Sequence, residues 1–116
     1  MRRDQVNVFR ALSDPNRLRI MKMLGERELC VCEIKHVLDL SVSTVSKHLS
    51  ILRDAGLITD AKDGKWVNYR LAASPENKLA RSMMKVLQQS FEDEATVQAD
   101  RKQVRKVDRN TICKLQ

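Results

Sequence analysis

The residues with the clearest chemical potential are two cysteines separated by one valine, Cys30 and Cys32. On a regular helix each residue turns by about 100°, so side chains two positions apart point about 200° away from each other. Both sulfurs can therefore bind one ion only where the chain is extended or unwound. Thiolates select soft, thiophilic ions, and an arsenite-like centre suits two or three sulfurs arranged as a pyramid. The pair predicts a ligand site whose occupation disturbs the start of a helix.

Other interpretations of the cysteines stay open at this point. Free cysteines are often small buried hydrophobic residues, and a disulfide between neighbours at i and i+2 is strained. The third cysteine, Cys113, stands alone near the C-terminus. It can supply a third sulfur to the pair of its own or a partner chain, or it can be a free, exposed thiol. We expect thiols or ligands rather than disulfides, because the chain is expected in the cytosol.

A second set with chemical potential is a run of hydroxyl side chains on the helix expected from about Ser43 to Ala55. Val45, Leu49 and Leu52 form its apolar stripe. Small hydroxyls enter a major groove without steric bulk and bond phosphates or base edges, although a solvated surface face is the alternative for serines alone. With two lysines that flank a hairpin tip, the predicted DNA-contacting residues are Ser41, Ser43, Thr44, Ser46, Lys47, His48, Ser50, Lys62 and Lys65.

Three shorter helices are predicted before this one. The first spans about Arg3–Leu12, where apolar residues recur at helical spacing. The second begins after Asp14 as N-cap, with Pro15 at its first position, and Gly25 is expected to end it in a left-handed cap. The third spans roughly Val31–Leu38. The cysteine pair therefore lies at the start of the helix that precedes the hydroxyl-bearing one.

After residue 56 the pattern changes to that of strands. Leu57–Thr59 and Trp66–Leu71 are β-prone, and the Asp63-Gly64 pair between them is a strong hairpin signal. A last long helix is expected to begin with Ser74 as N-cap and Pro75 at its first position, and to fade near Ala99. The fold class is therefore mainly α with a β-hairpin wing (α+β). It is a winged helix-turn-helix in which four helices precede the hairpin and a fifth follows it.

The position of the charge limits what it implies. The chain has 22 basic and 15 acidic residues, which gives a formal charge of +7. The segment 100–116 holds six basic and two acidic residues, so more than half of the excess lies where apolar periodicity is weak. We assign residues 1–99 to one DNA-binding domain and residues 100–116 to a basic, flexible tail.

The charge count also favours a dimer, in which two copies of the chain bind the same DNA. Segment 41–70 has five basic and three acidic residues, and so few phosphate contacts bind DNA weakly. Two copies on a twofold axis double the contacts and match a palindrome in double-stranded DNA. The apolar stripes of the first and last helices are expected to form the dimer interface, through Val6, Phe9, Leu79, Met83, Val86 and Leu87.

Several classes of protein are disfavoured. Aromatic residues make up only 3% of the chain, which is thin for a substrate pocket. No nucleotide-binding loop occurs, and the only histidines, His36 and His48, fall on the expected helix-turn-helix. A Cys-x-Cys redox enzyme is therefore not expected. No apolar run approaches the roughly 18–20 residues that cross a membrane, and the start lacks the apolar stretch of a signal peptide, so a cytoplasmic protein is expected.

These residues together resemble the arsenic-repressor (ArsR/SmtB) family. The matching stretches are residues 11–20, 28–34, 43–57 and 64–71, in the order that the family shows. The resemblance implies a homodimeric repressor that leaves operator DNA when metal ions bind. The Cys-Val-Cys motif implies the subgroup that responds to As(III) or Sb(III), bound at Cys30 and Cys32.

The chain departs from the family pattern at the third ligand. Members of the arsenite type often carry a third cysteine three residues after the second, and here that residue is Lys35. Relatives that sense cadmium or lead add cysteines in an N-terminal arm, and this chain has none before Cys30. Zinc and nickel sensors use histidine on the last helix, and none lies beyond His48. The alternative function is a repressor that senses another thiophilic metal (Cd, Pb or Zn) or thiol oxidation.

Overall fold

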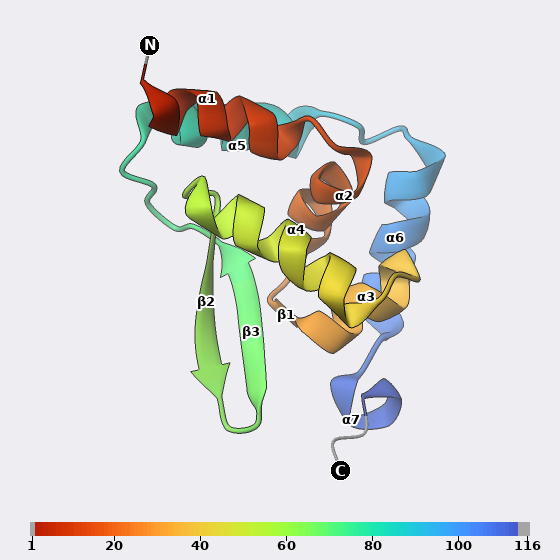
Figure 1. Cartoon of the computed structure of the whole chain (residues 1–116). Coiled ribbons are helices and arrows are strands. Elements are labelled where there is room, and N and C mark those ends of the chain that lie inside the picture. The colour runs from red at the N-terminus through yellow and green to blue at the C-terminus, as the bar shows by residue number, and fades with distance from the viewer. Residues whose placement is uncertain (1, 114–116) are drawn as a thin grey trace.

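The computed structural model describes residues 2–113 and shows a mainly helical chain with one small antiparallel sheet (Figure 1). The elements in chain order are α1 (Arg3–Leu12), α2 (Pro15–Leu24), β1 (Leu29–Cys30), α3 (Val31–Leu38), α4 (Val42–Asp54), β2 (Ile58–Asp63), β3 (Trp66–Leu71), α5 (Lys78–Gln89), α6 (Ala95–Lys106) and α7 (Arg109–Ile112). α1 and α5 lie side by side along one edge, and the hairpin of β2 and β3 projects on the opposite side (Figure 1). Within residues 2–113, no helix is both long and apolar enough to span a membrane.

The start of α2 confirms its predicted cap, whereas its end differs from the prediction. The Asp14 carboxylate accepts hydrogen bonds from the backbone N–H groups of Asn16, at 2.8 Å, and Arg17, at 3.1 Å. The prediction of a left-handed cap at Gly25 is wrong, because this residue has φ −65°. Its N–H group still bonds to the carbonyl four residues earlier, so the right-handed turn continues through the glycine.

α3 and α4 form the predicted helix-turn-helix, and α4 begins at Val42 with Ser41 as its N-cap. Asp39 ends α3 in the left-handed conformation, at φ 56°, which aspartate adopts more readily than most residues. Five aliphatic side chains close the core under the two helices and leave the outward face of α4 to solvent: Ile34, Leu38, Val45, Leu49 and Leu52.

The sheet contains the predicted hairpin and one strand that the sequence analysis missed. β2 and β3 pair from Ile58 opposite Leu71 to Asp63 opposite Trp66, which leaves a two-residue loop. Gly64 has φ +61° at the first loop position, where a type II′ turn requires glycine. β1 pairs with β3 on its other side, so the strand order is β1-β3-β2. A strand of two residues is too short to show a period of two, so the sequence carries no signal for it.

The long C-terminal helix is divided in the structure. Its predicted start at Ser74-Pro75 is wrong, because α5 begins at Lys78 and the Asn77 side chain caps it by accepting from two backbone N–H groups. α5 ends at Gln89, and the chain then turns through Phe91, whose φ is +64°. A second helix, α6, follows instead of a continuous rod.

Residues 100–113 are folded, so the predicted flexible tail from residue 100 is wrong for this part of the chain. α6 continues through residue 106 and packs against α2. Asp100 is buried and makes two hydrogen bonds of 2.8 Å to the Arg19 guanidinium, and Val104 is fully buried. Only two apolar residues of α6, Val97 and Val104, reach the core, and the charged residues between them hide this stripe in the sequence. Residues 114–116 of the predicted tail lie outside the described residues.

The packing of α6 gives a test by stability. Val104→Ala removes two buried methyl groups, and with the cavity it leaves we expect a loss of roughly 2 kcal/mol in the free energy of unfolding, measured by urea denaturation. Lys102→Ala, at an exposed position of the same helix, is the matched control and should change stability little. Equal stability of the two variants would show that α6 does not pack on the domain.

Candidate thiol site and nucleic-acid interface

Cys30 lies at the junction between a strand and a helix. It is the last residue of β1, opposite Asn68 of the hairpin, and it is also the N-cap residue of α3. Its backbone N–H donates to the Glu33 carboxylate, at 3.0 Å, which is the reciprocal bond of a capping box. Cys30 therefore belongs at once to the sheet and to the first helix of the helix-turn-helix.

The Cys30 sulfur is protected from solvent. The residue is only 2% exposed, and this burial raises the pKa of its thiol. The backbone N–H of Glu33 opposes the shift, whereas the nearby Glu33 carboxylate adds to it. The side chain is thus a neutral thiol near neutral pH in this arrangement.

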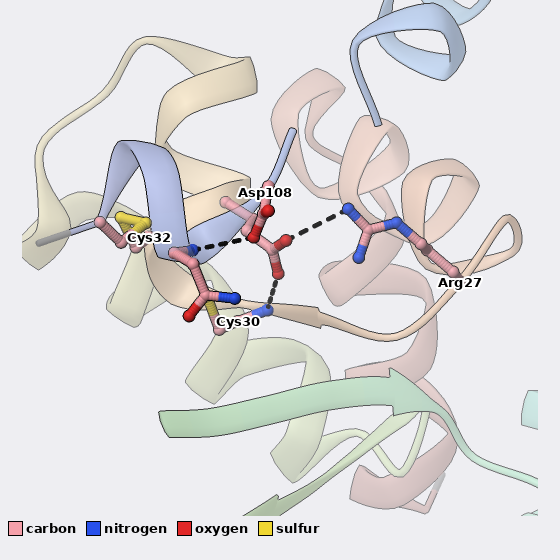
Figure 2. Close-up of a disulfide and its surroundings, with 7 residues drawn as sticks. Arg27, Cys30, Cys32 and Asp108 are labelled. Atoms are coloured by element: carbon pink, nitrogen blue, oxygen red, sulfur yellow. Dashed lines mark hydrogen bonds and ion pairs between the residues drawn. A yellow bond between two sulfur atoms is a disulfide. The ribbon is translucent and has the colours of Figure 1, made fainter. Parts of the chain in front are cut away.

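A half-buried ion pair supports the junction. Glu33 is 4% exposed and pairs with the Arg27 guanidinium at 3.1 Å (Figure 2). A buried carboxylate needs such a partner, because an unpaired charge inside a protein is costly. Arg27 also donates to the carbonyls of Val104 and Val107, at the C-terminal end of α6. The ion pair therefore ties the cap of α3 to the C-terminal helices.

Cys32, in the first turn of α3, is bonded to Cys113. The two residues are 81 positions apart in the sequence, and their Cα atoms are 5.8 Å apart. Cys113 follows α7 and is 6% exposed, so it is neither a free thiol nor exposed, and the expectation that no cysteine forms a disulfide is wrong. Figure 2 shows Cys30 apart from this disulfide. Within residues 2–113, no group of three potential ligand side chains is gathered around one point.

The predicted DNA-contacting residues of α4 lie mostly on its solvent face. Ser43, Thr44, Ser46 and Lys47 are exposed, and Ser50 is half-buried. The Ser41 hydroxyl accepts from the backbone N–H of Thr44 at 3.2 Å and donates to its hydroxyl at 2.8 Å, so this residue caps the helix. The hydroxyl side chains at the start of α4 therefore face solvent, and the Ser41 cap stabilises the turn that carries them.

His48 has a partner that the sequence analysis missed. Its Nδ1 atom lies 3.1 Å from a guanidinium nitrogen of Arg17, and arginine can only donate, so Nδ1 accepts. Arg17 also donates to the carbonyls of Ala11 and Arg10 at the end of α1. His48 therefore helps to fix α4 against α1 and α2. No local pattern signals this contact, because 31 residues separate the partners.

The hairpin carries the two predicted lysines and a contact from the far end of the chain. Lys62 and Lys65 are exposed near the tip. Arg109 of α7 donates to the side chains of Asn68, at 3.0 Å, and Asp63, at 2.9 Å, and its guanidinium lies 4.9 Å from the ring centroid of Trp66. The sequence analysis missed Arg109, because it assigned this segment to a flexible tail.

The predicted dimer residues do not share one environment. Phe9 of α1 and Val86 of α5 are exposed by 53% and 52%, which is unusual for large apolar side chains without a partner. Val6, Leu79 and Met83 are half-buried. Leu87 is 6% exposed and packs in the core of its own chain, so it is not available to a second copy.

Known proteins share the central part of this chain. The model of the arsR family of bacterial regulatory proteins matches residues 14–60. The chain is 47% identical over 68 residues to the arsenical resistance operon repressor of Escherichia coli (strain K12). The aligned part covers 58% of this chain and 58% of that protein. It is 50% identical over 62 residues to the cadmium resistance transcriptional regulatory protein CadC of Listeria innocua serovar 6a, with 53% and 52% covered. The chain thus spans between half and three fifths of the length of these relatives.

A solved structure extends the likeness to the fold. The solution structure of the homodimeric winged helix-turn-helix DNA-binding domain Mb0332 from Mycobacterium bovis, a possible ArsR-family regulator, matches with a TM-score of 0.64 at 28% identity. The match covers 78% of this chain and 81% of that one. Because the family model spans α2 to the start of β2 and the solved relative shares the winged helix around them, this chain belongs to the arsR family of bacterial transcriptional regulators, which are not enzymes.

Proposed function

We propose that this protein is a repressor that binds operator DNA as a homodimer through α4 and the β2–β3 hairpin, and that it leaves the operator when As(III) or Sb(III) binds Cys30 and Cys32. The observation that carries this proposal is the position of the cysteines. Cys30 is shared by β1 and the N-cap of α3, and Cys32 lies in the first turn of α3. The thiol site therefore pairs with the hairpin through β1 and lies on the helix that packs against α4.

The DNA-binding part is supported by the surface of α4 and the hairpin. The N-terminal half of α4 offers backbone N–H groups, exposed hydroxyls and one cation, Lys47, which suits phosphate oxygens and base edges. Homodimerisation is supported by the exposed apolar residues Phe9 and Val86 on the edge formed by α1 and α5. The related M. bovis domain is itself homodimeric.

The release step follows from the geometry of α3. Cys30 is already extended as the N-cap, but its sulfur accepts from the backbone N–H of Glu33 and Cys32 lies in the first helical turn, so binding one ion to both sulfurs takes the Cys30 sulfur out of its capping bond. The same change strains the reciprocal bond from the Cys30 N–H to Glu33 and the pairing of β1 with β3, because both depend on the position of Cys30. Each such bond contributes about 1 kcal/mol, which bonds to soft sulfur ligands can offset. α3 packs on α4, so the same event moves the DNA-contacting helix and frees the hairpin.

The chemistry of the pair favours a pyramidal centre. Two sulfurs fill most of the positions of an As(III) or Sb(III) ion, whereas a tetrahedral thiophilic cation needs two further ligands. The relatives include both an arsenical and a cadmium resistance regulator. Arsenite, antimonite, cadmium and zinc are therefore separate arms of the test.

Lys47 tests the DNA-binding face. In fluorescence anisotropy with the DNA upstream of its gene, Lys47→Ala should weaken binding and lower the slope of log affinity against log salt by about two for the dimer, one per lost phosphate contact. Lys102→Ala, which is exposed on α6, is the matched control. A salt slope in Lys47→Ala equal to that of the wild type would place the DNA elsewhere.

The thiol site is tested with serine variants of the reduced protein. Cys30→Ser and Cys32→Ser should keep operator binding and lose release by arsenite, because serine retains the size and the capping ability of cysteine but does not bind As(III). The readout is the same anisotropy assay with tris(carboxyethyl)phosphine as reductant, since dithiol reductants chelate arsenite. Cys113→Ser is the control and should still be released. Release by zinc alone, or loss of operator binding in both variants, would contradict the proposed function.

A further inference from the structure

We propose that the Cys32–Cys113 disulfide is a redox gate: when it forms, the repressor stays on DNA and no longer responds to metalloid. This inference rests on the function proposed above, because it concerns the availability of Cys32 as a ligand. The structure bonds Cys32 to Cys113 and leaves Cys30 as a buried free thiol. Cys32 can therefore bind a metalloid or form the disulfide, but it cannot do both at once.

Contacts other than the disulfide also hold the segment before Cys113 in place. Asp108 caps α7 by accepting from the backbone N–H of Asn110 at 2.9 Å (Figure 2), and Arg27 holds the carbonyl of Val107 at 2.8 Å. Arg109 anchors the same turn to the hairpin through Asp63, Asn68 and the face of Trp66, and its side chain is only 24% exposed.

These anchors hold the start of α7, and α7 packs against α3. The Cα atoms of Cys32 and Cys113 are 5.8 Å apart, within the ordinary range for a disulfide. A disulfide between these two residues thus joins elements that already pack together, rather than capturing a free tail.

The oxidation needs a two-electron oxidant, and a hydroperoxide supplies it. The thiolate of one cysteine attacks the peroxide, its O–O bond breaks, and a sulfenic acid and an alcohol or water form. The second thiol then attacks the sulfenic sulfur, which closes the S–S bond and releases water. Two thiols lose two protons and two electrons in total, and a thiol reductant reverses the step by exchange.

Oxidation and metalloid binding differ in what they do to α3. In the disulfide-bonded structure α3 is regular from Val31, and the capping bond from the Cys30 N–H to Glu33 is intact. The metalloid binding proposed above takes the Cys30 sulfur out of its capping bond and so disturbs this turn. The disulfide therefore removes Cys32 from the ligand site without the change that would release DNA.

The test compares three states of the full chain on operator DNA: reduced with tris(carboxyethyl)phosphine, oxidised with hydrogen peroxide that is then removed, and reduced again. Peptide mapping should find Cys32 joined to Cys113 in the oxidised sample. Operator affinity should be the same in the reduced and oxidised states. Release by arsenite should be complete in the reduced state, lost in the oxidised state and restored by reduction.

Three variants separate the gate from general oxidative damage. Cys113→Ser cannot form the bond, so it should still be released by arsenite after peroxide treatment. Arg109→Ala keeps all three cysteines but loses the anchor to the hairpin, so it should form the disulfide more slowly than the wild type at the same peroxide concentration. Cys30→Ser should form the disulfide at the wild-type rate.

The arms of the experiment distinguish the two proposals. Release of the oxidised wild type by arsenite, a Cys30–Cys32 disulfide, or dissociation on oxidation alone would each overturn the gate and leave the metalloid response of the reduced protein standing. A reduced protein that ignores arsenite would overturn the proposed function, and the gate with it.

Discussion

The chain changes from strand to helix at a single residue, Cys30, and both halves of the domain depend on that junction. Its backbone pairs with β3, and the same residue is the N-cap of α3. The capping carboxylate of Glu33 is buried, so it must keep its ion pair with Arg27. A buried charge that loses its partner costs several kcal/mol, of the order of 3–5. The junction therefore has one well-defined conformation, and a ligand that changes it acts on the hairpin and on the helix-turn-helix together.

The basic C-terminal segment is part of this architecture rather than a charged arm. Its arginines are engaged within the chain, in ion pairs of Arg101 with Glu26 and Glu92, Arg105 with Glu26, and Arg109 with Asp63. These pairs are partly exposed and individually weak, yet they surround a helix that also buries Val104 and the carboxylate of Asp100. Much of the positive charge of the segment is thus paired with carboxylates of the same chain. The surface that suits DNA is the exposed face of α4 together with the hairpin.

Cys32 connects these two parts of the molecule. It lies two residues after the junction, and its bond to Cys113 links α3 to the segment that Arg109 holds against the hairpin. The thiol site, the C-terminal helices and the hairpin therefore meet in one region, although they come from distant parts of the sequence. The exposed apolar edge of α1 and α5 lies on the other side of the domain (Figure 1), where a second copy would not interfere with this region.

The sequence by itself determined the elements whose signals are local. The cap at Asp14, the apolar stripe of α4, the turn at Gly64 and the close pair of cysteines each depend on residues within a few positions of one another. The order of these local signals by itself predicted the winged helix, and the family resemblance implied a homodimeric, metal-responsive repressor. Sequence reasoning therefore predicted the helix-turn-helix, the hairpin and the location of the thiol pair.

Only the tertiary structure decided the contacts between distant segments. β1 exists because β3 lies beside it, α6 is held by the pairing of Asp100 with Arg19, and Cys113 reaches Cys32 because α7 is anchored to the hairpin. None of these has a local signature, since the partners are tens of residues apart in the sequence. Such contacts form only after the loop entropy of bringing the segments together has been overcome by packing elsewhere. The sequence thus located the two cysteines that suit a soft ion, and the fold alone decided which sulfur meets which.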